Sequence, residues 1–286
     1  MNRRDFLPLF RDAKTIVIKV GSARVSGDDF EINDFLFSLA SDIRDLRDSG
    51  KKVVLVSSGA ISQGKKLLSN IDWESSKSIS LKEKQALAAI GQSKLMKLYE
   101  RIFSRVNIPI AQILFGKMEI ENHRGYENLQ NTFLQLLNWN ILPIVNENDS
   151  IATEELKVGD NDYLSGMVTL LVNADILVIL TGVDGFIKDN QTVSYLNDIL
   201  QADLELAKGP EGPGTGGMNT KLRTGRILRK AGIPTAIING KKKHIIRNLF
   251  AAEEEGTLIH GNQTRLPMDE KTFKELFNMK SGETNV

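Results

Sequence analysis

Thr15-Ile-Val-Ile-Lys-Val20 is the first of six short apolar runs along the chain, and β-branched residues dominate it. Runs of this length and composition predict β-strands, and a nearly continuous apolar character is typical of strands that are buried on both faces of a sheet. The five later runs are Val53–Val56, Ile108–Leu114, Ile141–Val145, Ile176–Leu180 and Thr235–Ile238.

Longer segments with a helical spacing of apolar residues separate these runs. The helix between the first two ends near Gly50, and five residues mark its buried face: Phe35, Leu36, Leu39, Ile43 and Leu46. Further helices are expected at Lys82–Arg105, Tyr126–Asn138, Asn161–Leu171 and Thr220–Ala231. Alternating strands and helices predict an α/β protein with a mainly parallel central sheet covered by helices.

The composition is that of a folded protein with a sizeable core. Of the 286 residues, 41% are hydrophobic and 26% are charged, which differs from the profile of a disordered chain. The 37 basic residues are balanced by 36 acidic ones, which argues against a protein that binds nucleic acid through its net charge. The absence of cysteine excludes disulfides, thiolate zinc sites and thiol nucleophiles.

No segment predicts a membrane anchor or a secretory signal. The longest apolar stretch, Met167–Val183, contains Asn173 and Asp175 and is shorter than the ~20 residues that a spanning helix needs. The apolar stretch near the N-terminus ends at Arg11 and lacks a small-residue cleavage site. We therefore expect a cytoplasmic protein with neither a membrane nor a nucleic-acid partner.

Lys19 is unusual because it lies inside the first apolar run, where burial of an unpartnered ammonium group would be costly. The alternation of a strand places it on the face opposite Ile18 and Val20, close to the end where open α/β sheets bind ligands. The alternative is an edge lysine whose ammonium group reaches solvent.

Ser57-Ser58-Gly59-Ala60 follows the second run and leads into a further helix. Hydroxyl groups and a glycine at such a junction offer an anion the backbone N–H groups of a helix N-terminus. An ordinary N-cap would have the same composition.

Two clusters of Asn and acidic residues, Asn146-Glu-Asn-Asp149 and Gly159-Asp-Asn-Asp162, also lie at predicted junctions between strands and helices. Each cluster alone could be turn and cap chemistry. Together they supply carboxylates that could orient lysines and carboxamides that could hydrogen-bond a polar substrate.

Gly214-Thr-Gly-Gly-Met-Asn-Thr-Lys221 ends a glycine-rich loop and leads a lysine into a helix, a combination that suits phosphate binding. It is not a P-loop, because the spacing from Gly216 to Lys221 differs and Leu222 follows the lysine.

The three histidines, His123, His244 and His260, show no metal-ligand spacing and no nucleophile motif. We expect them to be structural, and no residue is predicted to ligate a metal.

Taken in order, the motifs resemble those of the amino-acid kinase family, and within it most closely the glutamate 5-kinases. The resemblance covers about residues 14 to 260. The motifs that carry it are Ile18-Lys19-Val20-Gly21-Ser22, Val56-Ser-Ser-Gly-Ala-Ile61, Ala89-Ile-Gly-Gln92, Asn146-Glu-Asn-Asp149, Lys157-Val-Gly-Asp-Asn-Asp162 and Thr215-Gly-Gly-Met-Asn-Thr-Lys221.

The resemblance implies a three-layer αβα sandwich that transfers the γ-phosphoryl group of ATP, with Mg²⁺, to the side-chain carboxylate of L-glutamate, the first step of proline biosynthesis. Residues 1–265 would form a single kinase domain, with glutamate bound by its N-terminal part and ATP by its C-terminal part. Residues 266–286 would form a C-terminal tail, in which Phe273, Leu276 and Phe277 could dock as one helical turn. The resemblance also suggests a homo-oligomer, a dimer or tetramer, that proline inhibits.

The same resemblance assigns roles to individual residues. Lys19 and Lys221 would neutralise charge on the transferred phosphoryl group, and Asp162 would hold the two lysines in place. Glutamate would be bound by Ser58, Asp149 and Asn161. The nucleotide would be bound by Thr181, Gly182, Thr215, Gly216, Gly217, Met218, Asn219, Thr220 and Lys221.

The chemistry agrees with this assignment without a catalytic histidine. A glutamate carboxylate has an ordinary pKa of about 4.3, so it is already ionised at neutral pH and needs no general base. The remaining work is to bring two anions together and to stabilise the phosphoryl group in transfer, which lysines, backbone N–H groups and magnesium perform.

The chain departs from the family pattern in two places. Many relatives carry a C-terminal PUA module, whereas only 26 residues follow His260, so we expect no such domain. Thr181-Gly182 stands where many glutamate 5-kinases have Thr-Asp or Ser-Asp, which affects a nucleotide contact more than the reaction class.

Two alternatives remain at this stage. The chain could be a sister kinase acting on acetylglutamate, aspartate, a nucleoside monophosphate or another small acid, or a catalytically silent glutamate or nucleotide sensor. The location of one apolar helix face is also open. This face, formed by Leu129, Phe133, Leu136 and Leu137, could pack in the core or between subunits.

Overall fold

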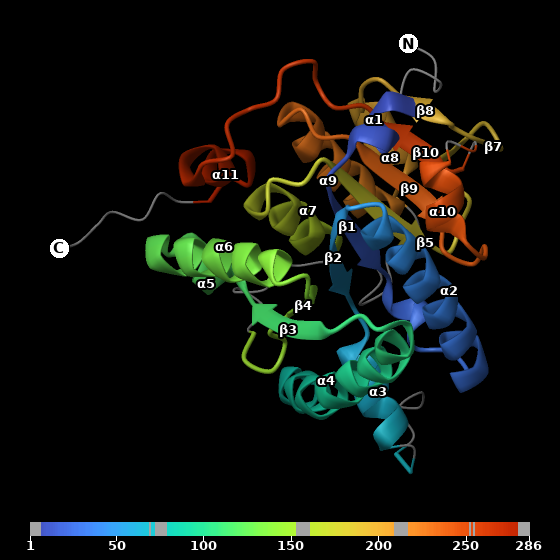
Figure 1. Ribbon diagram of the computed structural model, residues 1–286, viewed down its shortest axis with the longest axis vertical. Coiled ribbons are helices and arrows are strands. Elements are labelled where there is room, and N and C mark those ends of the chain that lie inside the picture. The colour runs from blue at the N-terminus through green and yellow to red at the C-terminus, as the bar shows by residue number, and fades with distance from the viewer. Residues whose placement is uncertain are drawn as a thin grey trace.

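The computed structural model describes residues 7–68, 70–71, 79–152, 161–208, 217–251, 253 and 255–279. Within them, one sheet has the strand order β3-β4-β2-β1-β5-β9-β10-β8 (Figure 1). The six strands from β3 to β9 are parallel to one another, β10 is antiparallel to β9, and β8 is parallel to β10. The predicted mainly parallel sheet is therefore confirmed.

All six apolar runs form strands of this sheet. Nearly every residue is buried in five of these strands, whereas β3 lies at the edge of the sheet and buries only Ile113 and Phe115. Their bounds are β1 Thr15–Val20, β2 Lys52–Ser57, β3 Ile110–Phe115, β4 Leu142–Glu147, β5 Ile176–Thr181 and β9 Thr235–Asn239. The short strands were not predicted, since two or three residues carry no pattern: β6 Ile187–Lys188, β7 Gln191–Thr192, β8 Tyr195–Leu196 and β10 Thr257–Ile259.

The predicted helices form as well, with shifts of a few residues at their ends. The α-helices are α1 Leu7–Asp12, α2 Asp29–Asp48, α3 Ala60–Leu67, α4 Leu81–Phe103, α5 Lys117–Glu121, α6 His123–Asn138, α7 Asn161–Leu171, α8 Gln201–Leu206, α9 Met218–Lys230, α10 Ile245–Phe250 and α11 Glu270–Leu276. Two 3₁₀ turns, η2 Ser22–Arg24 and η3 Ser104–Val106, follow β1 and α4.

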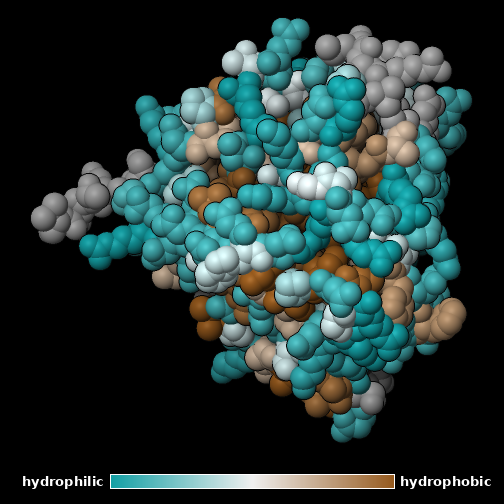
Figure 2. All heavy atoms as spheres, in the orientation of Figure 1, coloured by the Kyte–Doolittle hydropathy of each residue, from teal (hydrophilic) through white to brown (hydrophobic). Residues whose placement is uncertain are grey.

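Helices cover the sheet on both faces, which gives the three layers of an αβα sandwich (Figure 1). From β1, Ile16 and Ile18 pack with apolar residues of α2, α4 and α10 on one face. Val17 packs with residues of α6, α7 and α11 on the other face. Figure 2 shows a mostly hydrophilic surface in the same orientation, with hydrophobic side chains gathered toward the middle of the view.

The apolar face of α6 belongs to the core. Phe133 and Leu137 are buried among residues of the sheet and α7, and Leu129 and Leu136 pack against the same cluster. Of the two locations left open for this face, the structure therefore supports the core.

The predicted docking of the C-terminal segment is confirmed, although the segment forms a longer helix, α11, than one turn. Phe273 and Phe277 are buried. Their rings lie edge-on to Tyr126 and Tyr163, with ring centroids 5.3 Å and 4.8 Å apart. These contacts fix α11 against α6 and α7.

The strand order places β1 between β2 and β5, so the chain leaves the centre of the sheet in both directions. In open α/β sheets, ligands bind at such a switch point, outside the carboxyl ends of the strands. The segments that follow β1, β2, β4, β5 and β9 all lie at this edge, because those strands are parallel.

Two glycines allow α3 and α4 to cross at very short distance. A Cβ atom added to Gly91 of α4 would lie 1.8 Å from the carbonyl oxygen of Ala60 and 2.4 Å from the backbone nitrogen of Gly64. A Cβ atom on Gly64 would lie 2.1 Å from the carbonyl oxygen of Leu87. No other residue type fits at either position without separating the helices.

We therefore expect Gly91→Ala to lower the free energy of unfolding by about 1–3 kcal/mol or more, as overpacked cores do. Gly50→Ala is the matched control, because a Cβ atom there meets nothing within 4 Å and adds only the strain of a positive φ of 82°, about 1 kcal/mol. Urea unfolding of both variants tests this prediction. Equal losses would contradict the close helix contact.

Candidate active site

Lys19 is the fifth of the six residues of β1, and its side chain lies on the face covered by α7 and α9. The residue is only 3% exposed. The alternative of an edge lysine in contact with solvent is therefore wrong. An ammonium group at this depth needs a counter-charge, because burial without one is costly.

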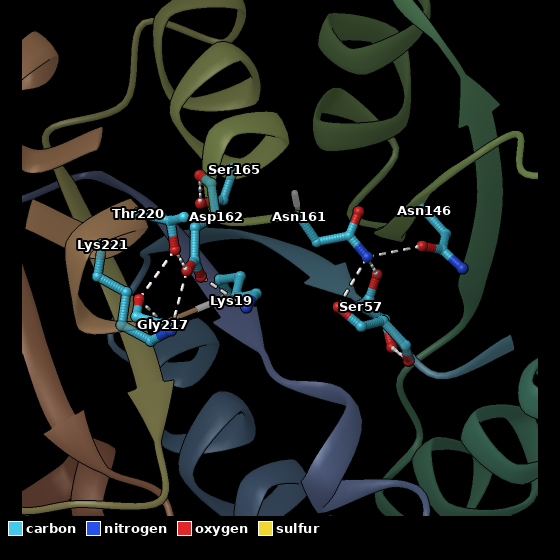
Figure 3. Close-up of polar contacts among 10 residues, drawn as sticks. Lys19, Ser57, Asn146, Asn161, Asp162, Ser165, Gly217, Thr220 and Lys221 are labelled. Atoms are coloured by element: carbon cyan, nitrogen blue, oxygen red, sulfur yellow. Dashed lines mark hydrogen bonds and ion pairs between the residues drawn. The ribbon is translucent and has the colours of Figure 1, made fainter. Parts of the chain in front are cut away.

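Asp162 supplies that counter-charge from the first turn of α7. Its carboxylate is fully buried, and Oδ1 lies 2.6 Å from the Nζ atom of Lys19. Oδ2 lies 2.9 Å from the Nζ atom of Lys221, which enters from α9 (Figure 3). Three residues predicted from separate motifs thus meet in one buried ion cluster.

Further hydrogen bonds fix the geometry of this cluster. The Thr220 hydroxyl donates to Oδ2 of Asp162 at 2.7 Å. Lys221 also donates to the carbonyl oxygen of Gly217 at 3.3 Å. Ser165 donates to the carbonyl oxygen of Asp162 at 2.5 Å, which holds the first turn of α7 in place.

The contacts of Asp162 determine its charge. Burial acts to raise the pKa of Asp162, but Lys19 and Lys221 outweigh this effect and hold the pKa below its ordinary value of 3.8. The carboxylate is therefore ionised at neutral pH, and two ammonium groups share one negative charge. Such a cluster is well suited to attract an anion.

Asn161, the neighbour of Asp162, points the other way and joins the ends of two strands (Figure 3). Its Nδ2 atom donates to the Ser58 hydroxyl at 2.7 Å and to the carbonyl oxygen of Ser57 at 3.1 Å, at the end of β2. The same atom donates to Oδ1 of Asn146, in β4, at 3.1 Å. The Oδ1 atom of Asn161 is buried and finds no hydrogen-bond partner among the described residues. It is a free acceptor at the site.

Asn146 is itself held from α4. Its Nδ2 atom donates to Oε1 of Gln92 at 2.8 Å, and its Oδ1 atom accepts from the backbone N–H of Glu147 at 3.0 Å. All three of these residues are at most 9% exposed. This part of the Asn/Asp cluster is a buried amide network and not turn chemistry.

Gly59 shapes the junction between β2 and α3. It adopts a φ of 106°, and a Cβ atom there would lie 2.4 Å from Cγ2 of Val25. No side chain caps the first turn of α3, so Ser57 and Ser58 are not ordinary N-cap residues. The Ser57 hydroxyl instead hydrogen-bonds the buried Tyr99 hydroxyl at 2.8 Å, which no sequence signal indicated.

Asp149 lies in a cleft of about 510 Å³ between α4, β3 and the segment after β4. Gln92, Gln112 and Glu147 also line this cleft. The cleft therefore adjoins the amide network through Gln92, on the side away from the lysines.

The predicted nucleotide residues that the structure describes lie at the end of β5 and at the start of α9. Thr181 ends β5 and accepts a hydrogen bond from the backbone of Gly240 at 2.9 Å. Gly182 follows it, and a Cβ atom there would meet nothing within 4 Å. Thr215 and Gly216 lie outside the described residues.

Gly217 precedes the first turn of α9, in which Thr220 and Lys221 contact Asp162, whereas Met218 and Asn219 make contacts within the fold. Met218 packs against a small apolar cluster. Asn219 donates to the carbonyl oxygen of Leu204 at 2.6 Å and accepts from Nε of Arg223 at 2.6 Å. The backbone N–H groups of this helix start are what remains for an anion.

Several contributors to the site were not assigned a role from the sequence. Three of them are Ser165, Tyr99 and Thr220, the last through its hydrogen bond to Asp162. All three lie on helices that the apolar spacing predicts, and that spacing gives no sign of their polar contacts. Gln92 and Asn146 lie within the motifs that carried the family resemblance, so their position in those motifs was the available signal.

Comparisons with known proteins agree with this geometry. Residues 14–239 match the model of the amino acid kinase family. The glutamate 5-kinase of Desulfotalea psychrophila is 40% identical over 259 residues, which cover 88% of this chain and 68% of that protein. The glutamate 5-kinase of Geobacter metallireducens is 39% identical over 260 residues, with 88% and 69% coverage.

Among solved structures, Giardia carbamate kinase superimposes with a TM-score of 0.60 at 19% sequence identity. The match covers 87% of this chain and 99% of that structure. At this level of identity the likeness concerns the fold.

Asp162→Asn should leave two buried ammonium groups without a counter-charge and lower the free energy of unfolding at pH 7 by about 3–5 kcal/mol. Because the pKa of Asp162 is lowered by folding, its stabilisation is complete above the ordinary value of 3.8 and is lost as the pH falls through the folded-state value. The difference between the two proteins should therefore shrink below pH 3.8. Denaturant unfolding at several pH values measures it.

Asp198→Asn is the matched control, because Asp198 pairs with Arg229 through a side chain that is 61% exposed. An exposed pair of this kind contributes at most about 1 kcal/mol. An Asp162→Asn protein as stable as the Asp198→Asn protein at pH 7 would contradict the buried ion cluster.

Proposed function

The chain belongs to the amino acid kinase family, and from that premise we propose that its lysine cluster transfers the γ-phosphoryl group of ATP to the side-chain carboxylate of L-glutamate. The product is L-glutamate 5-phosphate, and the reaction is the first step of proline biosynthesis. The observation that carries this proposal is the pair of ammonium groups held on Asp162 beside the amide site of Asn161.

The transfer needs charge stabilisation more than proton chemistry. The attacking carboxylate is ionised at neutral pH, and its approach to a phosphoryl group brings two anions together. Lys19 and Lys221 would stabilise the negative charge on the oxygens of the transferred group, and Asp162 would hold both ammonium groups in advance. Such preorganised charge lowers the barrier because nothing needs to reorient during the reaction.

We assign the glutamate site to Ser58, Asn161 and Asp149. Ser58 and Asn161 are hydrogen-bonded to each other and lie next to the residue that holds the lysines. Asp149 supplies a carboxylate from the adjoining cleft, which suits an ammonium group.

We assign the nucleotide site to Thr181, Gly182 and the segment from Thr215 to Lys221. The support is the position of Thr181 and Gly182 at the end of β5 and of Gly217 to Lys221 at the start of α9, where Lys221 joins the ion cluster. The open space at Gly182 lets a nucleotide approach the backbone without a side chain in between.

ATP is expected to bring Mg²⁺, which supplies further positive charge to the phosphate oxygens. Within the described residues, no group of three His, Asp or Glu side chains could hold a metal ion. Both oxygens of Asp162 contact lysines. We therefore assign no protein residue as a ligand of the ion.

The surroundings of the reaction are also part of the proposal. Among the described helices, none combines the length and apolar character that crossing a bilayer requires. We propose a cytoplasmic enzyme that works as a single kinase domain over residues 1–265, self-associates and is inhibited by proline. Gel filtration with light scattering and an assay with added proline test the last two points.

Lys221→Met should lower kcat with L-glutamate about 10²-fold or more, because one preorganised charge on the phosphoryl group is lost. Lys230→Met is the matched control, since Lys230 is an exposed lysine at the end of the same helix and should keep wild-type activity. The assay traps the acyl phosphate with hydroxylamine and follows ADP release.

L-Glutamate, N-acetyl-L-glutamate, L-aspartate and UMP are to be compared as acceptors in that assay. Preference for any of the last three would overturn the substrate assignment and keep the phosphoryl transfer. Absence of activity with all four would favour a silent sensor.

Asn161→Ala should raise the KM for L-glutamate about 10-fold or more, since hydrogen bonds at the substrate site are lost. The KM for ATP should stay within about 2-fold, because the nucleotide lies beyond Asp162. Asn138→Ala is the control, because Asn138 is exposed and its side chain accepts a hydrogen bond from the exposed Lys52 at the start of β2, the end of the strand remote from Ser57. A larger rise in the KM for ATP than in the KM for L-glutamate would contradict the assignment of Asn161 to the glutamate site.

A further inference from the structure

A second cleft, of about 820 Å³, lies on the outer side of α9. Residues of α7, α8, α9 and α11 line it, so elements far apart in the sequence form it together. Its volume is within the range of about 300–1,000 Å³ that is usual for small-molecule sites. No described residue lines both this cleft and the one that contains Asp149. The second cleft is therefore a separate candidate for ligand binding.

Apolar side chains form one part of its lining. They are Leu204 of α8, Ile227 of α9, Leu266 and, from α11, Leu276. Ile227 and Leu276 are only partly buried against the core behind them, so each still offers apolar surface to the cleft. The ring of Tyr163 also lines the cleft, and its hydroxyl donates to a backbone carbonyl oxygen at the end of α11 at 3.1 Å. Burial of an apolar ligand body against these side chains is favourable, since it removes apolar surface from water.

Two arginines of α9 bring positive charge to the same cleft. Arg223 and Arg226 are three residues apart, so their side chains lie on the same side of the helix. Nε of Arg223 donates to the neutral side chain of Asn219 at 2.6 Å. Arg226 is half-buried and makes no hydrogen bond to any described residue. Both guanidinium groups therefore keep N–H donors available.

No carboxylate among the described residues neutralises these two arginines by direct contact. Asp198 is attracted at longer range but forms its ion pair with Arg229. Glu205 is attracted in the same way but forms its ion pair with Lys208. Glu275 is the one described carboxylate that lines the cleft, and it forms no ion pair with either arginine. The guanidinium groups are therefore available to an anion from outside the fold.

We propose that this cleft binds a small organic anion with an apolar body. The anionic group lies against Arg223 and Arg226, and the body lies against the apolar side chains. Guanidinium groups bind carboxylate, sulfonate and phosphate groups through paired hydrogen bonds. An inorganic anion would leave the apolar lining in contact with water, and an uncharged ligand would leave the guanidinium groups unused. A ligand that has both parts matches the whole cleft.

The cleft is distinct from the proposed substrate sites. Lys221 and Leu222 are buried on the side of α9 that faces the core, whereas Arg223 and Arg226 lie on the outer side. Among the described residues assigned to the nucleotide, Thr220 and Lys221 contact Asp162, and only Thr220 also lines the cleft. The inference therefore goes beyond the proposed function and does not depend on it.

Anilinonaphthalene sulfonate is a suitable probe, because it joins a sulfonate to an aromatic body and fluoresces more strongly when it leaves water. Phenylnaphthylamine has the same body without the sulfonate. Fluorescence titration of the full chain measures the Kd of each probe. Arg226→Glu should raise the Kd of the sulfonate probe about 10-fold or more, because an attractive charge becomes a repulsive one. The Kd of phenylnaphthylamine should change less than about 3-fold, since apolar burial alone holds this probe.

Arg44→Glu is the matched control. Arg44 is an exposed arginine of α2, which covers the other face of the sheet, and the variant makes the same change of charge. It should leave the Kd of the sulfonate probe within about 2-fold at 0.1 M salt, because distant exposed charges are screened. Arg226→Gln removes the charge without reversing it, and urea unfolding establishes that each variant is folded. This variant should raise the Kd about 3-fold or more.

An equal Kd of the sulfonate probe in wild type, Arg226→Gln and Arg226→Glu would overturn the inference. Displacement of the probe by ATP and Mg²⁺ to the same extent in all three proteins would also overturn it, because the probe would then occupy the nucleotide site. Neither result bears on phosphoryl transfer to L-glutamate, which the hydroxylamine assay tests separately.

Discussion

The ion cluster of Asp162, Lys19 and Lys221 is the interaction on which the site depends. Moving three charges out of water is expensive, and their mutual attraction offsets this only when the geometry is good. Here each carboxylate oxygen contacts one ammonium group, and the Thr220 hydroxyl adds a further donor. Two ammonium groups therefore share the single carboxylate of Asp162. Under the proposed function, this arrangement places two positive charges where the transferred phosphoryl group would lie.

The first turn of α7 connects this cluster to the amide network of Asn161. Successive side chains of a helix point about 100° apart, and Asn161 and Asp162 use that angle to reach different partners (Figure 3). From Leu164 to Leu171 every residue of α7 is buried, so the helix cannot rotate without disturbing both faces of the core. The distance between the side-chain amide of Asn161 and the lysines that Asp162 holds is therefore fixed by packing and not by loop contacts.

The sequence predicted the strands and most helices because buried parallel strands are almost purely apolar, which also made Lys19 conspicuous. The family resemblance also predicted that Asp162 holds both lysines, but the residue pattern alone could not, since Lys221 lies 59 positions away and only the fold brings the two together. The contact between Ser57 and Tyr99 was not predictable, because a tyrosine on a buried helix face is explained by packing alone. The short strands β8 and β10 form only because β9 offers an edge to pair with.

The close contact between α3 and α4 positions residues of the candidate site. Gly91 lets α4 approach Ala60 and Gly64 at distances that no side chain permits. Ala60 follows directly after Ser58-Gly59, the junction that Asn161 contacts. Gln92 follows directly after Gly91 and reaches Asn146 from the same helix. A loss of this helix contact would therefore move Gln92 relative to Ser58 and separate the two ends of the amide network. Gly91 is therefore required for the close contact of the two helices, and through that contact it fixes the positions of Ser58 and Gln92 relative to each other.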